Sequence, residues 1–72
     1  MYSVVECVNG NYSVKAEGLS EQAAKVFYFG RCQALWNASD VITGTVAILT
    51  PELFIFGGYS ERIEHAPQEQ GE

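Results

Sequence analysis

The chain has 72 residues, of which 47% are apolar, and its formal net charge is -5. This length allows one domain at most, and the apolar content separates the chain from the polar composition of disordered proteins. Nine acidic residues against four scattered basic ones disfavour binding to the phosphate backbone of nucleic acids. A core of this size is marginally stable alone, so we expect a homo-oligomer, a dimer or larger.

The N-terminal sequence MYSVVECVNG has no cluster of positive charge and no long apolar run, so we expect neither a signal peptide nor a membrane span. The default location is then the cytoplasm, where Cys7 and Cys32 are expected to stay reduced. The preferred interpretation of both thiols is that of small buried hydrophobes. A disulfide between them stays open, because it depends on their separation in the fold.

Residues 2–8 (YSVVECV) are predicted to form the first strand, since they are rich in β-branched side chains. The pair Asn9-Gly10 that follows is a strong hairpin signal, because both residues tolerate positive φ. Residues 11–17 alternate apolar and polar side chains, which predicts a second strand paired antiparallel to the first. The side chains expected on its buried face are Tyr12, Val14 and Ala16.

Residues 21–37 are predicted to form a helix, and Ser20 is predicted to cap it by accepting a hydrogen bond from a first-turn backbone N–H. Gly30 in the middle of this helix costs about 1 kcal/mol relative to alanine. It indicates either a close backbone crossing or a tolerated glycine, and both interpretations stay open. The apolar stripe expected against the sheet comprises Ala24, Phe27, Tyr28, Cys32 and Leu35.

Residues 41–50 (VITGTVAILT) are predicted to form a central strand, since both of its faces are largely uncharged. Pro51 ends this strand because proline has no N–H for a ladder, and a tight connection leads into a last strand over residues 53–65. The paired Gly57-Gly58 would be a phosphate-binding loop only if a helix followed, and YSERIEH offers no helical pattern. The two glycines are therefore predicted to bend the strand.

The predicted order is β-β-α-β-β, which makes the chain an α+β protein with a four-stranded antiparallel sheet and one helix packed on one face. Placing the third strand beside the first gives the order 2-1-3-4, with every pair antiparallel. The alternative order 1-2-3-4 needs one parallel pair and is less favoured, because antiparallel pairs are commoner. The domain is expected over residues 1–65, with residues 66–72 as a disordered acidic tail.

One helix covers only one face of such a sheet, so the other face is expected to be apolar and exposed unless a partner lies over it. An exposed apolar patch usually marks a protein contact, which favours association. The alternative is that curvature at the paired glycines folds the sheet onto itself. The residues predicted to line the contact are Val41, Leu49, Phe54 and Phe56.

Side chains that carry enzyme or metal chemistry are few, and no catalytic, cofactor-binding or metal site is predicted. His65 is the single histidine and lies next to the tail, where neither a pre-organised base nor a metal site with Glu61 and Glu64 is expected. A Cys32 nucleophile is not expected either, since thiols on the buried side of a helix are usually inert. Arg31 interrupts the apolar stripe of the helix, and we expect it to extend past the core edge or to pair with a carboxylate such as Glu61.

Three functions remain, and the preferred one is a small protein-interaction module that self-associates through the open sheet face or an edge strand. The second is a small-molecule-binding or enzymatic domain with a pocket between helix and sheet. The third, supported by charge alone, is an acidic decoy that occupies a basic nucleic-acid-binding surface. The residues predicted to line the pocket of the second are Tyr12, Tyr28, Cys32 and Tyr59.

Overall fold

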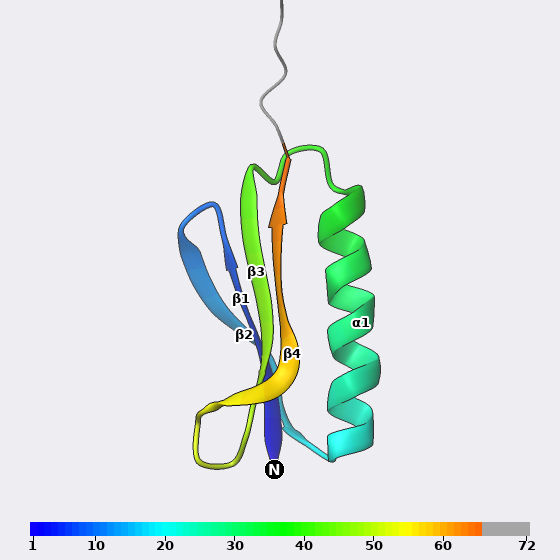
Figure 1. The fold of residues 1–72 in the computed structure, drawn as a ribbon, viewed down its shortest axis with the longest axis vertical. Coiled ribbons are helices and arrows are strands. Elements are labelled where there is room, and N and C mark those ends of the chain that lie inside the picture. Colours follow the sequence, from blue (N-terminus) through cyan, green and yellow to red (C-terminus); the bar gives the residue numbers. More distant parts are fainter. Residues whose placement is uncertain (66–72) are drawn as a thin grey trace, which may run out of the picture.

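The computed structural model of the chain describes residues 1–65. Four strands form one antiparallel sheet in the order β2-β1-β3-β4, and one helix packs on one of its faces (Figure 1). This confirms the predicted fold class and strand order. The predicted tail, residues 66–72, lies outside the described residues. The elements in chain order are β1 (Tyr2–Val8), β2 (Asn11–Leu19), α1 (Glu21–Asn37), β3 (Thr43–Leu49) and β4 (Ile55–Glu64).

The β1–β2 hairpin turns at Asn9 and Gly10, whose φ angles are 49° and 87°. Two successive positive φ values are those of a type I′ turn, which matches the twist of the paired strands. Asn9 also holds the chain that enters β3. Its Oδ1 accepts hydrogen bonds from the backbone N–H of Ile42 at 2.8 Å and of Thr43 at 3.1 Å, and its Nδ2 donates to the carbonyl of Asp40 at 3.2 Å. One residue therefore both forms the hairpin turn and positions the start of β3.

The helix α1 begins and ends where the sequence predicts, at Glu21 and Asn37. Ser20 is its N-cap, and the Ser20 Oγ accepts a hydrogen bond from the backbone N–H of Ala23 at 3.1 Å. The prediction that Phe27 is buried is wrong, because Phe27 is 36% exposed. Helical spacing places it on a flank, beside the inward stripe. The buried residues of α1 are Ala24, Tyr28, Cys32 and Leu35.

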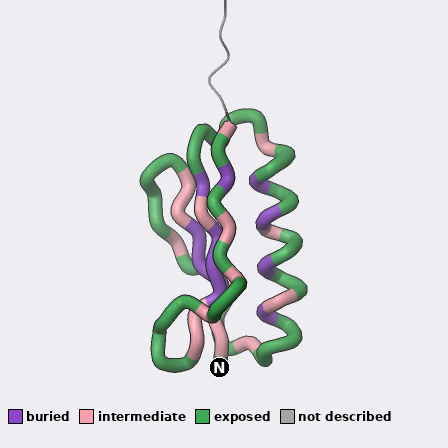
Figure 2. The backbone as a smooth tube through the Cα atoms, in the orientation of Figure 1, coloured by how far each residue is buried: buried purple, intermediate pink, exposed green. Residues whose placement is uncertain are grey.

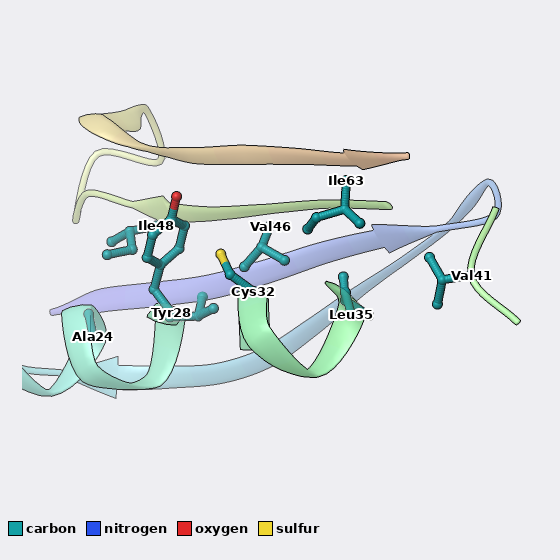
Figure 3. Close-up of a cluster of buried hydrophobic side chains, with 9 residues drawn as sticks. Ala24, Tyr28, Cys32, Leu35, Val41, Val46, Ile48 and Ile63 are labelled. Atoms are coloured by element: carbon teal, nitrogen blue, oxygen red, sulfur yellow. The ribbon is translucent and has the colours of Figure 1, made fainter. Parts of the chain in front are cut away.

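The core lies between α1 and one face of the sheet. Buried positions recur along the inner side of α1 and along the central strands, while the outer positions are exposed (Figure 2). Gly44 of β3 permits close packing of the two layers, because a Cβ there would lie 3.1 Å from Cδ1 of Leu35. The core residues, most of them labelled in Figure 3, are Val4, Ala24, Tyr28, Cys32, Leu35, Val41, Val46, Ile48 and Ile63.

Arg31 pairs with Glu6 of β1, and not with Glu61 as the sequence suggested. Its Nε donates to one carboxylate oxygen of Glu6, and its Nη2 donates to the other at 3.2 Å. Glu6 is only 1% exposed, so the pair holds a buried charge between α1 and the sheet. The hydrogen bond to Glu6 raises the pKa of the Arg31 guanidinium. The double contact sets the position of α1 over β1.

β4 bends at the paired glycines, as predicted. Gly58 has a φ of 84°, in the left-handed region that favours glycine. Ala47 of β3 pairs with Ser60, and Leu49 pairs with Ile55. An advance of two residues along β3 therefore corresponds to five residues along β4. The additional residues of β4 form a bulge, which identifies the glycines as part of a strand and not of a phosphate-binding loop.

β2 does not bury the face that its alternation predicts. Tyr12 and Val14 are 64% and 48% exposed, while Ala16 is half-buried. The pairing with β1 shifts register between Val14 and Ala16, and Lys15 is the additional residue. Because one additional residue reverses the alternation of side chains, Val14 and Ala16 lie on opposite faces of the sheet. Tyr12 and Val14 therefore point away from α1.

Replacing Gly30 with alanine should stabilise the protein. Gly30 is exposed, and apart from the helix's own backbone no atom of the structure lies within 4 Å of the position that its Cβ would take, so no other segment crosses there. We expect Gly30→Ala to raise the free energy of unfolding by about 0.5–1 kcal/mol, measured by urea denaturation. The control Gly44→Ala should lower it, because the new Cβ would press on Leu35. Destabilisation by Gly30→Ala would contradict the tolerated-glycine interpretation.

Replacing Arg31 with methionine should destabilise the protein strongly. The substitution leaves the buried Glu6 carboxylate without its partner, which costs about 3 kcal/mol of unfolding free energy for a pair with one partly exposed member. The double variant Glu6→Leu/Arg31→Met should recover most of that loss, because it removes the buried charge as well. Urea denaturation of the wild type and the two variants checks this. Equal stability of Arg31→Met and the wild type would contradict a structural role for the pair.

Candidate functional site

The sheet face that points away from α1 is the candidate contact surface, and we call it the open face. Successive side chains of a strand point to opposite faces, and Val4 and Val46 belong to the core under α1. Their neighbours Val5 and Ala47, which pair with each other, therefore lie on the open face. The open-face residues are Tyr12 and Val14 of β2, Ser3, Val5 and Cys7 of β1, Thr43, Thr45, Ala47 and Leu49 of β3, and Ile55, Ser60, Arg62 and Glu64 of β4.

The open face is apolar and nearly free of net charge. Tyr12, Val14 and Ile55 are 64%, 48% and 60% exposed. The central strands β1 and β3 contribute no charged side chain to it. The two charges from β4 neutralise each other, since Arg62 Nε donates to Glu64 Oε2 at 2.6 Å. Exposed apolar side chains on a surface without net charge fit another protein surface better than they fit water.

The connection between β3 and β4 adds further apolar side chains beside this face. The backbone N–H of Leu53 donates to the Thr50 carbonyl, and the N–H of Phe54 donates to Thr50 Oγ1 at 3.2 Å. These bonds hold a tight turn in which Leu53 has a φ of 71°. Leu53 and Phe54 are each 71% exposed. Figure 1 shows this connection projecting on the side of the sheet away from α1.

The four residues predicted to line a contact are divided between the two sides of the sheet. Leu49 is half-buried on the open face, and Phe54 is exposed in the neighbouring turn. Val41 is 4% exposed and belongs to the core under α1. Phe56 is half-buried and packs against the same core. The predicted grouping assumed an unbroken alternation, whereas Val41 precedes β3 and the bulge at Gly57-Gly58 changes the alternation in β4.

Aromatic rings cluster on the other side of β4, next to α1. The rings of Phe56 and Tyr59 are stacked, with centroids 5.2 Å apart and an interplanar angle of 13°. Tyr28 meets Tyr59 edge to face at 5.7 Å. Lys25 Nζ lies 5.1 Å from the Tyr59 centroid and 3.0 Å from Glu21, and the hydrogen bond to Glu21 raises the pKa of Lys25. These contacts join the start of α1 to the bend in β4.

Three of the four residues predicted to line a pocket meet in the structure. Tyr28 and Cys32 are buried and point from α1 toward the sheet (Figure 3), and Tyr59 contacts Tyr28. Tyr12 lies on the open face, across the sheet from them. Burial raises the pKa of the Tyr28 phenol and of the Cys32 thiol. A thiol that stays protonated at neutral pH is a weak nucleophile, so these residues behave as core.

Both cysteines are free thiols. Cys7 lies on the open face and Cys32 lies in the core under α1, so the sheet separates them.

At the end of the described chain, His65 Nε2 lies 3.0 Å from the carbonyl oxygen of Leu35. Within residues 1–65 no three His, Cys, Asp or Glu side chains are arranged to hold a metal ion. No helix of the same part of the chain is long and apolar enough to cross a membrane.

The sequence analysis missed a set of exposed apolar side chains on α1. Val26, Phe29 and Trp36 are 66%, 59% and 47% exposed. The available signal was that apolar residues occur on all sides of this helix, which is unusual for a helix with one face in water. Two of them lie beside β4, since the ring centroid of Phe29 is 6.2 Å from that of Tyr59 and the centroid of Trp36 is 5.8 Å from that of His65.

Comparisons of this chain with protein families, with curated proteins and with solved structures find no match. Its function is therefore inferred from its own surfaces.

Stability should fall at alkaline pH because of Tyr28 and Cys32. Both pKa values are raised in the folded protein by burial, so the unfolded chain loses these protons first, near pH 9 for the thiol and pH 10 for the phenol. The free energy of unfolding should be constant below about pH 9 with respect to these groups and decline above it. Tyr28→Phe should flatten the decline above about pH 10, measured by urea denaturation at several pH values.

The matched control for this titration is Tyr12→Phe, which removes a phenol from an exposed position. It should leave the alkaline decline unchanged. A decline that is the same in Tyr28→Phe and in the wild type would exclude Tyr28 as a cause.

Proposed function

We propose that the chain is a small intracellular protein-interaction module that self-associates, with the open face as its contact surface. The observation that carries this proposal is the exposure of Tyr12, Val14 and Ile55 on a face whose two central strands bear no charge. The single helix covers the other face (Figure 1). Val5 and Ala47 at the centre of the open face are 8% and 5% exposed, so its exposed apolar area lies on the outer strands, at Tyr12, Val14 and Ile55. Association through this surface would bury apolar area that the monomer leaves in water.

The symmetry of a homodimer favours a surface of this kind. A two-fold contact brings the same patch of both subunits together, so a patch with strong net charge would repel itself. The chain as a whole carries a net charge of -5, but the Arg62 and Glu64 charges on the open face cancel. Two sheets that pack face to face lie about 10 Å apart and interdigitate their side chains. The apolar open face meets both requirements.

Two features support an intracellular location within this proposal. Both cysteines are free, which suits a reducing compartment. Small domains in oxidising compartments commonly depend on disulfides for stability, whereas this fold is organised around an apolar core between α1 and the sheet.

The proposal is tested by the molar mass in solution, measured by light scattering across a dilution series at neutral pH with reductant present. We expect the wild type to form a dimer or larger assembly. Val14→Glu places a charge in the open face at a position that is already 48% exposed, and it should shift the mass toward the monomer while leaving the fold intact.

The matched control is Val26→Glu, the same substitution on the outer surface of α1, where Val26 is 66% exposed. This variant should keep the wild-type mass. A wild type that is monomeric at every concentration, or a Val14→Glu variant that associates like the wild type, would refute self-association through the open face.

A further inference from the structure

We infer that β4 is a second self-association site, at which two copies pair β4 with β4 in antiparallel orientation about Ile63. The two four-stranded sheets would then form one continuous sheet. This contact uses the main-chain edge of β4, whereas the proposed function uses side chains of the open face, so it goes beyond the function proposed above. Arg62 and Glu64 belong to both surfaces.

β4 is an edge strand with a row of backbone groups that lack a strand partner. β3 pairs with one side of it only, and that pairing is regular from Ser60 to Glu64. The backbone N–H of His65 donates to the Ile42 carbonyl at 3.0 Å, on the side of β3. Because backbone groups alternate in direction along an antiparallel strand, residues 61 and 63 also point toward β3. Residues 60, 62 and 64 therefore present their N–H and C=O groups to the outside, where a further strand would pair.

The side chains along this edge are complementary in charge to a second copy of themselves. With Ile63 opposite the partner's Ile63, Arg62 lies opposite the partner's Glu64, and Glu64 lies opposite the partner's Arg62. The same register places Glu61 opposite the partner's His65. Symmetric registers centred on Glu61, Arg62 or Glu64 would instead place a like charge opposite itself. Among symmetric registers centred on residues 61–64, the charges therefore favour the one centred on Ile63.

The backbone directions agree with this register. Ile63 points its own N–H and C=O toward β3, so the central pair of the new interface is one without hydrogen bonds. The neighbouring pairs, Arg62 with the partner's Glu64 and the reverse, are then hydrogen-bonded pairs, which together make about four main-chain bonds. They use the outward-pointing groups that the monomer leaves to water.

Exposed aromatic side chains of α1 lie along the same edge. Phe29 and Trp36 are 59% and 47% exposed, and their rings approach Tyr59 of β4 and His65, the residue that follows β4. The two-fold axis of an antiparallel strand pair is perpendicular to the sheet, so both helices would lie on the same side of the joined sheet. Pairing of β4 therefore brings the two α1 helices together at the flanks that carry these rings, and it gives the exposed aromatic side chains an apolar partner.

The other edge strand, β2, is less suitable for pairing. Lys15 and Glu17 have opposite charges on either side of Ala16, which would also be complementary in an antiparallel pair. However, Lys15 forms the bulge in the pairing with β1, and Gly18 has a φ of 71°. Bulges and kinks turn an edge away from further strands, so β2 lacks a regular row of free groups.

The test exchanges the charges of the edge in the Val14→Glu background, in which association through the open face is blocked, and measures dimerisation by native mass spectrometry and light scattering at low ionic strength. Arg62→Glu alone and Glu64→Arg alone each place like charges opposite one another, so each should weaken dimerisation about tenfold. An equimolar mixture of the two variants, distinguished by isotope labelling of one, should form a heterodimer with an affinity close to that of the Val14→Glu parent. In the mixture every cross-strand pair of residues 62 and 64 again joins opposite charges. Recovery of dimerisation in the mixture also shows that both variants are folded.

The matched controls make the same changes of charge on the other edge strand, Lys15→Glu and Glu17→Arg, and they should leave dimerisation unchanged. The inference is overturned if the wild type is monomeric, if Arg62→Glu and Glu64→Arg dimerise like the Val14→Glu parent, or if their mixture associates no better than each variant alone. Complete loss of association in Val14→Glu would overturn pairing through β4 while supporting the open face.

Discussion

The packing of a single helix on one face of a four-stranded sheet is the constraint on which the rest of the molecule depends. α1 supplies the apolar side chains that complete the core with alternate residues of β1, β3 and β4. The same alternation places the intervening strand positions on the other face, where residues 1–65 provide no second layer. The open face and its exposed apolar residues are therefore a direct result of the architecture.

Electrostatic contacts in this protein orient elements more than they stabilise them. The buried Glu6 and partly exposed Arg31 join β1 to α1 through two hydrogen bonds. Burying such a pair costs desolvation energy that its attraction only offsets, so its main effect is to define where α1 sits. The exposed pair Arg62 and Glu64 contributes little to stability. Its importance lies in the pattern that it presents along β4 to a second copy.

The open face and the β4 edge are compatible within one assembly. In the inferred pairing, both helices lie on one side of the joined sheet, and both open faces therefore lie together on the other side. The apolar surface that results is twice as wide as that of one chain. An edge contact would in this way build the broad surface that packing of two sheets requires. The exposed rings of Phe29 and Trp36 fit the same arrangement, because they lie on the flank of α1 next to β4.

Local sequence signals were sufficient for the elements and for their order. The turn at Asn9-Gly10, the cap at Ser20, the ends of α1 and the bend at Gly57-Gly58 each depend on the conformational preferences of a few neighbouring residues, and the structure confirms them. The strand order followed from the preference for antiparallel pairs together with the single helical crossover. The same reasoning predicted an uncovered sheet face, but of the four residues that it assigned to the contact, Val41 and Phe56 pack with the core instead.

Only the tertiary structure decided which side chains share a face and which charges meet. The additional residue at Lys15 and the bulge at Gly58 each change the alternation of their strand, and this moved Val14 to the open face and placed Phe56 against the core. Arg31 pairs with Glu6 because β1 lies beneath that flank of α1. The two residues are 25 positions apart, so no local sequence pattern predicts their contact. The sequence by itself determined the elements, since they depend on short-range preferences. The surfaces depend on register and on contacts between distant segments, which form only when the sheet and helix are assembled.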